Sequence, residues 1–346
     1  MRLSLEELTA DIDDDFKEVV ASLSQIFSYG AQMKKGRATH TYGVAARGTA
    51  RCIVSPDFPE NDFFKFGQEH PMVLRHSSPG GEQDDRTRDG CAASVKIFDA
   101  DDKDTSGEGS LDVLMNAGRQ LFVRSIRDFL TMVQAPLEKR TELCQQGLIM
   151  DKELTEAYRI RGSFADYRYH TWNCFEFIDA HGKMNYIRFR LVPGDRGPER
   201  GLPPADFECE GQLTKPPVEG DPRAEDFLRQ DFIYRVKHSD VRYILQAQLH
   251  APETPAVENS EVLNPAVAWD ETFYPWFDLY EISVDEMIEN NDEVSALTMD
   301  PNRSPQCIKL PLATSPDHYA SLGQARAIVY PTARGKRKEA EHPQNN

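Results

Sequence analysis

Long apolar runs, clustered cysteines and positive charge are all scarce in this chain of 346 residues. No apolar stretch reaches the roughly 18 residues that a membrane-spanning helix needs, and the acidic N-terminal segment is unlike a secretory signal. The net charge of −17 disfavours binding to nucleic acid through a general positive field. We therefore expect a cytoplasmic protein with no transmembrane segment and no nucleic-acid partner.

The six cysteines are scattered along the chain, and no two of them form a CxxC pair. Zinc sites and disulfide frameworks usually show short, regular cysteine spacings. The pattern therefore predicts buried thiols in a reducing compartment. What the chain does have is a hydrophobic fraction of 39%, with 10% aromatic residues, which is enough for a sizeable core.

Apolar residues recur with helical spacing in some segments and with strand spacing in others. The helical segments are 5–28, 118–133, 221–238 and a last one from 315 to Tyr330, which Pro331 should end. The strand-like segments include a pair within 42–54, a buried strand at 111–115, a meander over 167–193 and a strand at 241–250. We expect an α+β protein with an N-terminal helix at 1–29, one domain at 30–332 and a disordered basic tail at 333–346.

An arginine and a tyrosine four residues apart carry the most specific chemistry. Arg326 and Tyr330 should project from one face of the last predicted helix. A neighbouring guanidinium favours the phenolate, and ionising a tyrosine at neutral pH requires its pKa to fall from about 10 to about 7. Tyrosinate is a known axial ligand of haem iron. The same spacing also suits a buried structural tyrosine, and spacing alone does not decide between the two.

Three further polar residues are candidates for a site. His40 has hydroxyl neighbours on both sides, which offer a way to fix its tautomer for acid–base chemistry. Asn116 stands at a strand-to-helix junction, where an amide can cap a helix or face a ligand. Arg75 follows an apolar strand and can clamp a carboxylate or stay on the surface. Each residue also has a purely structural interpretation, and only their order along the chain narrows the choice.

The order of several segments resembles the catalase superfamily, and in particular the catalase-related allene oxide synthases. The segments are RATHTYGVAARGTARCIV, FPENDFFKFGQEHPMVLRHSS, DRTRDGCAASVKIFDA, LDVLMNAG, RFRLVPGD, YILQAQLH, WDETFYPWFDL and SPDHYASLGQARAIVY, and they span about residues 30 to 332. The resemblance implies an eight-stranded antiparallel β-barrel with surrounding helices and haem b bound beside the barrel.

The resemblance also assigns roles around the iron. His40 and Asn116 match the distal histidine and asparagine. Tyr330 matches the proximal tyrosinate that binds iron, and Arg326 matches the arginine that holds its charge.

Four more residues are implied to contact the haem macrocycle or its substituents. Arg37 and Arg75 match arginines that bind the propionates. Phe129 lies where catalases place a phenylalanine on the distal face, and Phe122 is a second candidate for lining the pocket.

Two residues beside His40 indicate different branches of the superfamily. Thr39 stands where the synthase-like branch has threonine and catalases usually have valine, and a hydroxyl bonding His40 would weaken it as a base. Ser77 occupies the position of the serine with which catalases orient the distal histidine, where coral-type synthases have alanine. The resemblance therefore implies a mixed distal site.

The function that the resemblance favours is the transformation of fatty-acid hydroperoxides, an allene oxide synthase-like dehydration through O–O cleavage at a tyrosinate-ligated haem. The alternatives are a minimal catalase or peroxidase acting on hydrogen peroxide, and a haem carrier or sensor without turnover. We expect a separate lipoxygenase to supply the hydroperoxide. Lys34 or Lys35 is a candidate for meeting the fatty-acid carboxylate, and the sequence leaves open whether the chain forms a homodimer.

Overall fold

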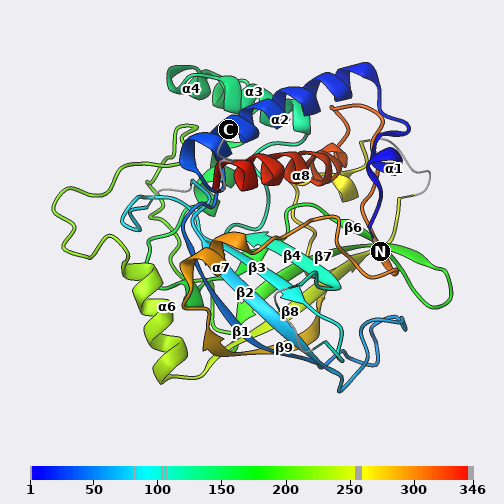
Figure 1. Cartoon of the computed structure of the whole chain (residues 1–346). Helices are drawn as coiled ribbons and strands as arrows, with labels where there is room; N and C mark the ends of the chain where they lie inside the picture. Colours follow the sequence, from blue (N-terminus) through cyan, green and yellow to red (C-terminus); the bar gives the residue numbers. More distant parts are fainter. Residues whose placement is uncertain (1, 81–82, 103–104, 106, 254–258, 342–346) are drawn as a thin grey trace.

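The computed structural model describes residues 2–80, 83–102, 105, 107–253 and 259–341. Within these residues, antiparallel strands form a single sheet that closes on itself (Figure 1). The strands are β1 (Gly43–Cys52), β2 (Glu69–Ser77), β3 (Ala92–Ile97), β4 (Leu111–Asn116), β5 (Tyr169–His170), β6 (Phe175–Ile178), β7 (Met184–Pro193), β8 (Val241–His250), β9 (Trp276–Met287) and β10 (Ile308–Lys309).

The sheet is a barrel because β8 pairs with both β7 and β9. In the described part of the chain the closed ring has eight strands, in the order β7-β5-β4-β3-β2-β1-β9-β8. The short strands β6 and β10 extend the sheet from the first half of β7, outside the ring. The predicted eight-stranded antiparallel barrel is confirmed.

The strands β2, β3 and β4 have two different faces, since side chains alternate along a strand. One face fills the barrel interior with apolar side chains, among them Leu74, Ala93, Val95 and Val113. The other face points out of the barrel. The strand register pairs Ser77 with Ala92 and Ala92 with Asn116, so these three residues form one row across the outer face.

Helices cover this outer face and enclose a second apolar core. The α-helices are α1 (Leu5–Thr9), α2 (Asp14–Lys34), α3 (Ile126–Gln134), α4 (Leu137–Gln145), α5 (Asp151–Ala157), α6 (Phe227–His238), α7 (Asn291–Ala296) and α8 (Ser321–Glu341). In Figure 1, α8 lies above the barrel, with α2, α3 and α4 higher still. No helix in the described ranges is long and apolar enough to span a membrane.

The last helix is longer than predicted and begins later. It starts at Ser321 rather than at 315, and it continues through Pro331 to Glu341, although proline offers no N–H to the helix. Packing against α2 holds it in place, and Arg334 forms an ion pair with Asp300 at 3.7 Å. The basic segment is therefore helical as far as Glu341 and not a disordered tail. Residues 342–346 lie outside the described part.

Several other predicted boundaries were wrong where contacts distant in sequence decide them. Segment 5–28 is two helices, because Asp13 caps α2 by accepting from the Phe16 N–H at 2.7 Å, and its own N–H donates to the Thr314 carbonyl at 2.8 Å. Segment 118–133 is helical only from Ile126, where the Ser125 hydroxyl caps α3. Segment 42–54 holds one long strand instead of a pair. The strand at 241–250 is confirmed. In segment 167–193, β6 and β7 form the predicted hairpin with its turn at 180–182, whereas β5 pairs with β7 instead of β6, so the three strands do not form a meander.

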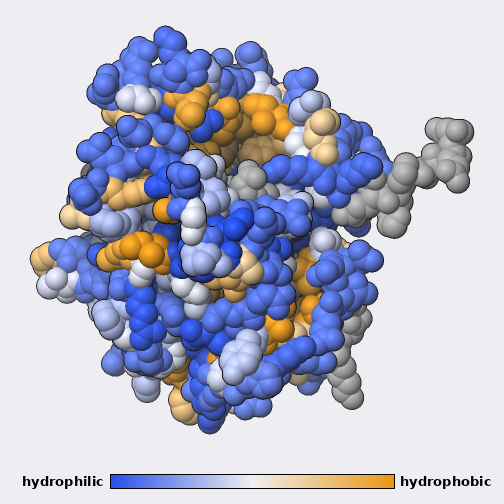
Figure 2. Space-filling model, turned by 90° about the vertical axis from the view of Figure 1, so that its left-hand side faces the viewer, coloured by the Kyte–Doolittle hydropathy of each residue, from blue (hydrophilic) through white to orange (hydrophobic). Residues whose placement is uncertain are grey.

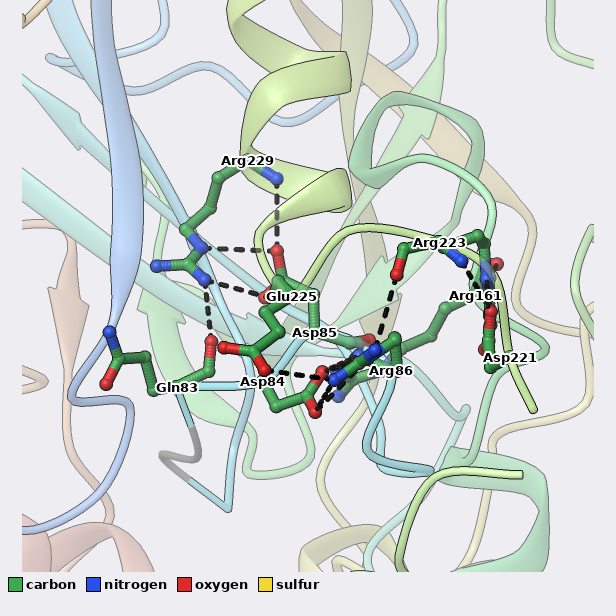
Figure 3. A network of polar contacts seen from close by, with 9 residues as sticks. All are labelled: Gln83, Asp84, Asp85, Arg86, Arg161, Asp221, Arg223, Glu225 and Arg229. Carbon is green, nitrogen blue, oxygen red and sulfur yellow. Dashed lines mark hydrogen bonds and ion pairs between the residues drawn. The ribbon is translucent and has the colours of Figure 1, made fainter. Parts of the chain in front are cut away.

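The helix expected from 221 starts at Phe227, because a distant carboxylate caps it. Asp85 Oδ2 accepts hydrogen bonds from the N–H groups of Leu228 at 3.2 Å and Arg229 at 3.3 Å. Figure 3 shows Asp85 within a network of alternating acidic and basic side chains at this helix end.

The predicted free thiols are also confirmed, since all six cysteines are unbridged and five of them are buried.

Candidate functional site

A cavity of about 680 Å³ lies between the outer face of β2–β4 and the helices α2, α3, α4 and α8. Its volume falls in the usual range for cofactor and ligand pockets, roughly 300–1,000 Å³. On the face shown in Figure 2, apolar side chains gather around a hollow in the upper part, where the helices lie. Every residue predicted for the site lines this cavity: Arg37, Thr39, His40, Arg75, Ser77, Asn116, Phe122, Phe129, Arg326 and Tyr330.

One wall of the cavity is a single face of α8. Its lining residues recur every three or four positions, the spacing of one helix face: Leu322, Ala325, Arg326, Val329, Tyr330, Ala333, Arg334 and Arg337. Arg326 Nε donates a hydrogen bond to Tyr330 Oη over 3.1 Å. A guanidinium in this position stabilises negative charge on the phenol oxygen, which is what a tyrosinate ligand of haem iron requires.

His40 is held in an unusual backbone conformation on the barrel side of the cavity. Its φ of 54° lies in the left-handed region, which costs free energy for a residue other than glycine. Arg75 Nη2 donates to the His40 carbonyl oxygen at 2.8 Å and so fixes this turn. The ring Nδ1 lies 3.1 Å from Ser77 Oγ. The hydroxyl of Ser77 therefore orients the imidazole, and Nε2 remains for a ligand.

The His40 ring is neutral at physiological pH. Burial lowers its pKa to about 3, and the positive charges of Arg75, Arg326 and Arg37 contribute to that shift. The ring is enclosed by protein, but the side that faces the cavity stays accessible. A neutral imidazole with one nitrogen already hydrogen-bonded can accept a proton at the other nitrogen.

Asn116 lies two strands away from Ser77 in the row described above. Strands are about 4.8 Å apart, so roughly 10 Å separate the two backbones, and the small side chain of Ala92 between them leaves room for a ligand. Asn116 Oδ1 is buried and has no hydrogen-bond partner among the described residues. Because buried polar atoms are normally paired, this amide is suited to contact a bound group.

Thr39 belongs to the cavity lining, whereas Lys34 and Lys35 lie outside it. Thr39 lines the cavity next to His40, but the hydroxyl that reaches the imidazole is that of Ser77. Lys34 and Lys35 are exposed at the end of α2 and do not belong to the cavity lining that the described residues form. Gly36, which follows them, lines the cavity, and the contact expected between one of these lysines and a fatty-acid carboxylate near the pocket mouth stays a prediction.

The cavity also gathers positive charge in an acidic protein. Five guanidinium groups line it near the tyrosine and the histidine: Arg37, Arg75, Arg326, Arg334 and Arg337. Burial lowers the pKa of Arg75 to about 10, and the charge of Arg337 adds to this effect. Arg75 Nε is buried without a hydrogen-bond partner in the described part of the chain. Such a cluster is suited to bind carboxylate groups.

Sequence reasoning missed Arg337, because Pro331 was taken as the end of the helix. Arg337 follows Tyr330 by seven positions, which is two helical turns, and it is buried on the same face of α8. The helical period would have found this arginine if the helix had been extended through the proline.

The residues present fit haem b. Apolar side chains line the space that a macrocycle would occupy. Among them, the Phe129 ring stacks on the Phe27 ring with 6.4 Å between the ring centroids, and 6.0 Å separate the ring centroids of Phe122 and Trp172. Tyr330 could supply an oxygen ligand for the iron, and the guanidinium cluster could supply partners for two propionates. The buried Asn116 amide oxygen and Arg75 Nε are the unpaired polar atoms that such a group would face.

Comparison with solved structures identifies the architecture. A fungal catalase superposes with a TM-score of 0.65 at 17% identity, over 89% of this chain and 60% of the catalase chain. Catalase A from Saccharomyces cerevisiae gives a TM-score of 0.66 at 15% identity, over 87% of this chain and 61% of the other. The sequence is also 29% identical over 321 residues, 92% of the chain, to a linolenate 9R-lipoxygenase of Nostoc. This chain has the catalase fold.

Other proteins similar in sequence to this chain carry varied names. It is 59% identical over 232 residues to the uncharacterized protein y4iK of Sinorhizobium fredii, covering 67% of this chain and 100% of y4iK. It is 28% identical over 327 residues, 90% of the chain, to the allene oxide synthase-lipoxygenase protein of Plexaura homomalla. The chain spans 41% of the Nostoc protein and 29% of the Plexaura protein. No protein-family model matches the chain.

Proposed function

We propose that this protein binds haem b in the cavity and transforms fatty-acid hydroperoxides by cleaving their O–O bond, with dehydration to an allene oxide as the outcome. The observation that carries the proposal is the meeting of two residue pairs in one cavity. Arg326 and Tyr330 come from α8, and His40 and Asn116 come from the barrel side. The names of the Nostoc and Plexaura relatives support a lipid substrate.

In this proposal, Tyr330 would bind the iron and the Arg326 guanidinium would keep its phenolate oxygen charged. Arg37, Arg75 and Arg337 would hold the propionates. When bound, the haem supplies the redox chemistry that breaks the O–O bond. The remaining steps belong to the protein's own side chains.

His40 would transfer the proton of the peroxide, and Asn116 would hydrogen-bond its oxygen. Neutral His40 can accept the hydroperoxide proton at Nε2, because Ser77 occupies Nδ1. The Asn116 amide can orient the peroxide oxygen by a hydrogen bond. Protonated His40 can then return the proton to the departing oxygen, and the second proton with which this oxygen leaves as water would come from the lipid carbon that becomes part of the allene oxide. The apolar walls around Phe129 would exclude bulk water from the reactive lipid.

A second function is favoured by one observation. The Ser77–His40 contact at 3.1 Å orients the imidazole, and the resemblance associates a serine in this position with catalases. A relative from Mycolicibacterium paratuberculosis, 25% identical over 248 residues, 68% of this chain and 70% of its own length, is named a catalase-related peroxidase. Disproportionation of hydrogen peroxide, or peroxidase turnover, is therefore the second candidate.

The deciding test is parallel turnover of two substrates by the haem-loaded protein. Rapid loss of the conjugated-diene absorbance of a polyunsaturated fatty-acid hydroperoxide, with little oxygen release from hydrogen peroxide, is the expected result. Vigorous oxygen release with an inert lipid would favour the second function. Full haem loading with no turnover of either peroxide would leave a haem carrier or sensor as the function.

The variant Tyr330→Phe tests the assigned iron ligand. It should lose the charge-transfer spectrum of a tyrosinate-ligated haem, and an unchanged spectrum would contradict the assignment.

A further inference from the structure

One arginine of the cavity stands apart from the guanidinium cluster. Arg140 belongs to α4 and lines the cavity beside Leu137 and Leu213. Its Nε donates a hydrogen bond to the Ala135 carbonyl oxygen at 3.3 Å, which fixes the side chain against the turn between α3 and α4. That carbonyl is its only hydrogen-bond partner within the described ranges, and no carboxylate there pairs with it.

The surroundings of Arg140 are mostly apolar. Leu137 and Arg140 are three residues apart on one face of α4, and Leu137 is 52% exposed, so this wall reaches the solvent. On the other side, the backbone of Gly211 packs so closely that a Cβ there would come within 3.0 Å of the Arg140 carbonyl oxygen. Burial lowers the pKa of Arg140, and this is the single cause of the shift.

A half-buried guanidinium without a counter-ion is unfavourable beside apolar side chains, because part of its hydration is lost. Lys139, the neighbouring cation on α4, differs from Arg140 in having a carboxylate partner. Lys139 points to solvent and pairs with Glu142 at 3.4 Å. Arg140 instead faces the space that a substrate would occupy, and it lacks the partner that a ligand carboxylate would supply.

We propose that Arg140 binds the carboxylate of the fatty-acid hydroperoxide. The anionic end of the substrate would lie on α4 at the solvent side of the cavity, and its chain would run along Leu213, Phe27 and Phe129 towards His40. This assignment rests on the proposed function and defines its substrate class as a free acid. It gives to a residue of the cavity lining the role that the sequence suggested for Lys34 or Lys35.

The test uses the haem-loaded protein and three variants. Arg140→Gln removes the charge, Arg140→Lys keeps it without the two-pronged geometry, and Lys139→Gln removes a neighbouring charge that does not face the cavity. Turnover is measured with a polyunsaturated fatty-acid hydroperoxide and with its methyl ester. Calorimetry measures binding of the corresponding hydroxy fatty acid, which has no O–O bond to cleave.

Arg140→Gln should raise the KM for the free acid and the Kd for the hydroxy acid roughly tenfold, as expected for one charge-assisted hydrogen-bonded pair. The kcat should stay within about twofold, since the reacting groups are untouched. The methyl ester should be handled alike by Arg140→Gln and by the unmodified protein. Lys139→Gln should match the unmodified protein, and Arg140→Lys should lie in between.

The two proposals fail in different ways. If the lipid is consumed but acid and ester respond equally to Arg140→Gln, the carboxylate assignment is wrong and the proposed function stands. If no lipid is consumed while the hydroxy acid still binds more weakly to Arg140→Gln than to Lys139→Gln, the carboxylate site stands and the proposed function is wrong. Equal Kd values in all four proteins would overturn the role of Arg140.

Discussion

At the scale of single residues, the two hydroxyl groups beside His40 are not equivalent. Ser77 is the last residue of β2, and its Oγ lies 3.1 Å from the imidazole Nδ1. Thr39 precedes His40 on the left-handed turn and lines the cavity instead. The resemblance implied that Ser77 orients the imidazole and that a Thr39 hydroxyl bonding His40 would weaken it as a base, and the structure shows the contact from Ser77.

Ser77→Ala and Thr39→Val therefore form an informative pair. Ser77→Ala should lower the rate of peroxide turnover about tenfold, because general acid–base catalysis needs a positioned imidazole. Thr39→Val should change that rate by no more than about twofold, since it leaves the Ser77 contact intact. Stopped-flow measurement with the haem content matched between variants tests both. A larger loss in Thr39→Val than in Ser77→Ala would assign the orienting role to the threonine.

At the scale of elements, the sequence predicted best where the decisive contacts are local or strictly periodic. Strand β8 was predicted with its observed ends, and the Arg326–Tyr330 pair followed from helical spacing. Boundaries set by distant partners were missed, as at α6, whose cap comes from a residue 143 positions away. Pro331 was predicted to end the last helix, because a proline inside a helix removes a backbone hydrogen bond. Packing of α8 on the rest of the protein keeps the helix continuous through this residue.

The unexpected extension of α8 places Arg337 in the cavity, and this leads to a prediction about haem. Arg337→Gln should weaken haem binding roughly tenfold to a hundredfold, because it removes one charge-assisted partner of a propionate. Lys338→Gln, next along the same helix and exposed, is the matched control and should bind haem like the unmodified protein. Titration of the haem-free protein with haemin gives both affinities. Equal affinity in the two variants would exclude a propionate contact by Arg337.

At the scale of the whole molecule, the barrel and its cavity wall keep several histidines neutral. His76 fills the barrel interior, where its Nε2 lies 3.0 Å from Tyr243 Oη and its ring stacks on Phe164 at 5.2 Å. Burial lowers the pKa of His76 to about 3, and burial also lowers the pKa of His40 to about 3. Burial holds the pKa of His170 well below its usual value as well. The folded state therefore depends on imidazoles without a proton.

The lowered pKa values of these histidines make the folded state less stable as the pH falls. A histidine in the unfolded chain has a pKa near 6.5, so between about pH 6.5 and 3 the unfolded state binds more protons than the folded state. The contribution of these neutral histidines to the free energy of unfolding is fully present above about pH 6.5, and it is lost as the pH falls from about 6.5 to 3. At pH 5 the loss amounts to about 2 kcal/mol for one such histidine.

His76→Gln should remove its share of this pH dependence, because glutamine keeps a hydrogen-bonding amide but does not titrate. Urea denaturation of the haem-loaded proteins at pH 7 and pH 5 measures the effect. The unmodified protein should lose about 2 kcal/mol more of its unfolding free energy than His76→Gln between these pH values. His181→Gln, in the exposed turn between β6 and β7, should behave like the unmodified protein. Parallel losses in all three proteins would show that His76 is not a neutral imidazole in the folded barrel.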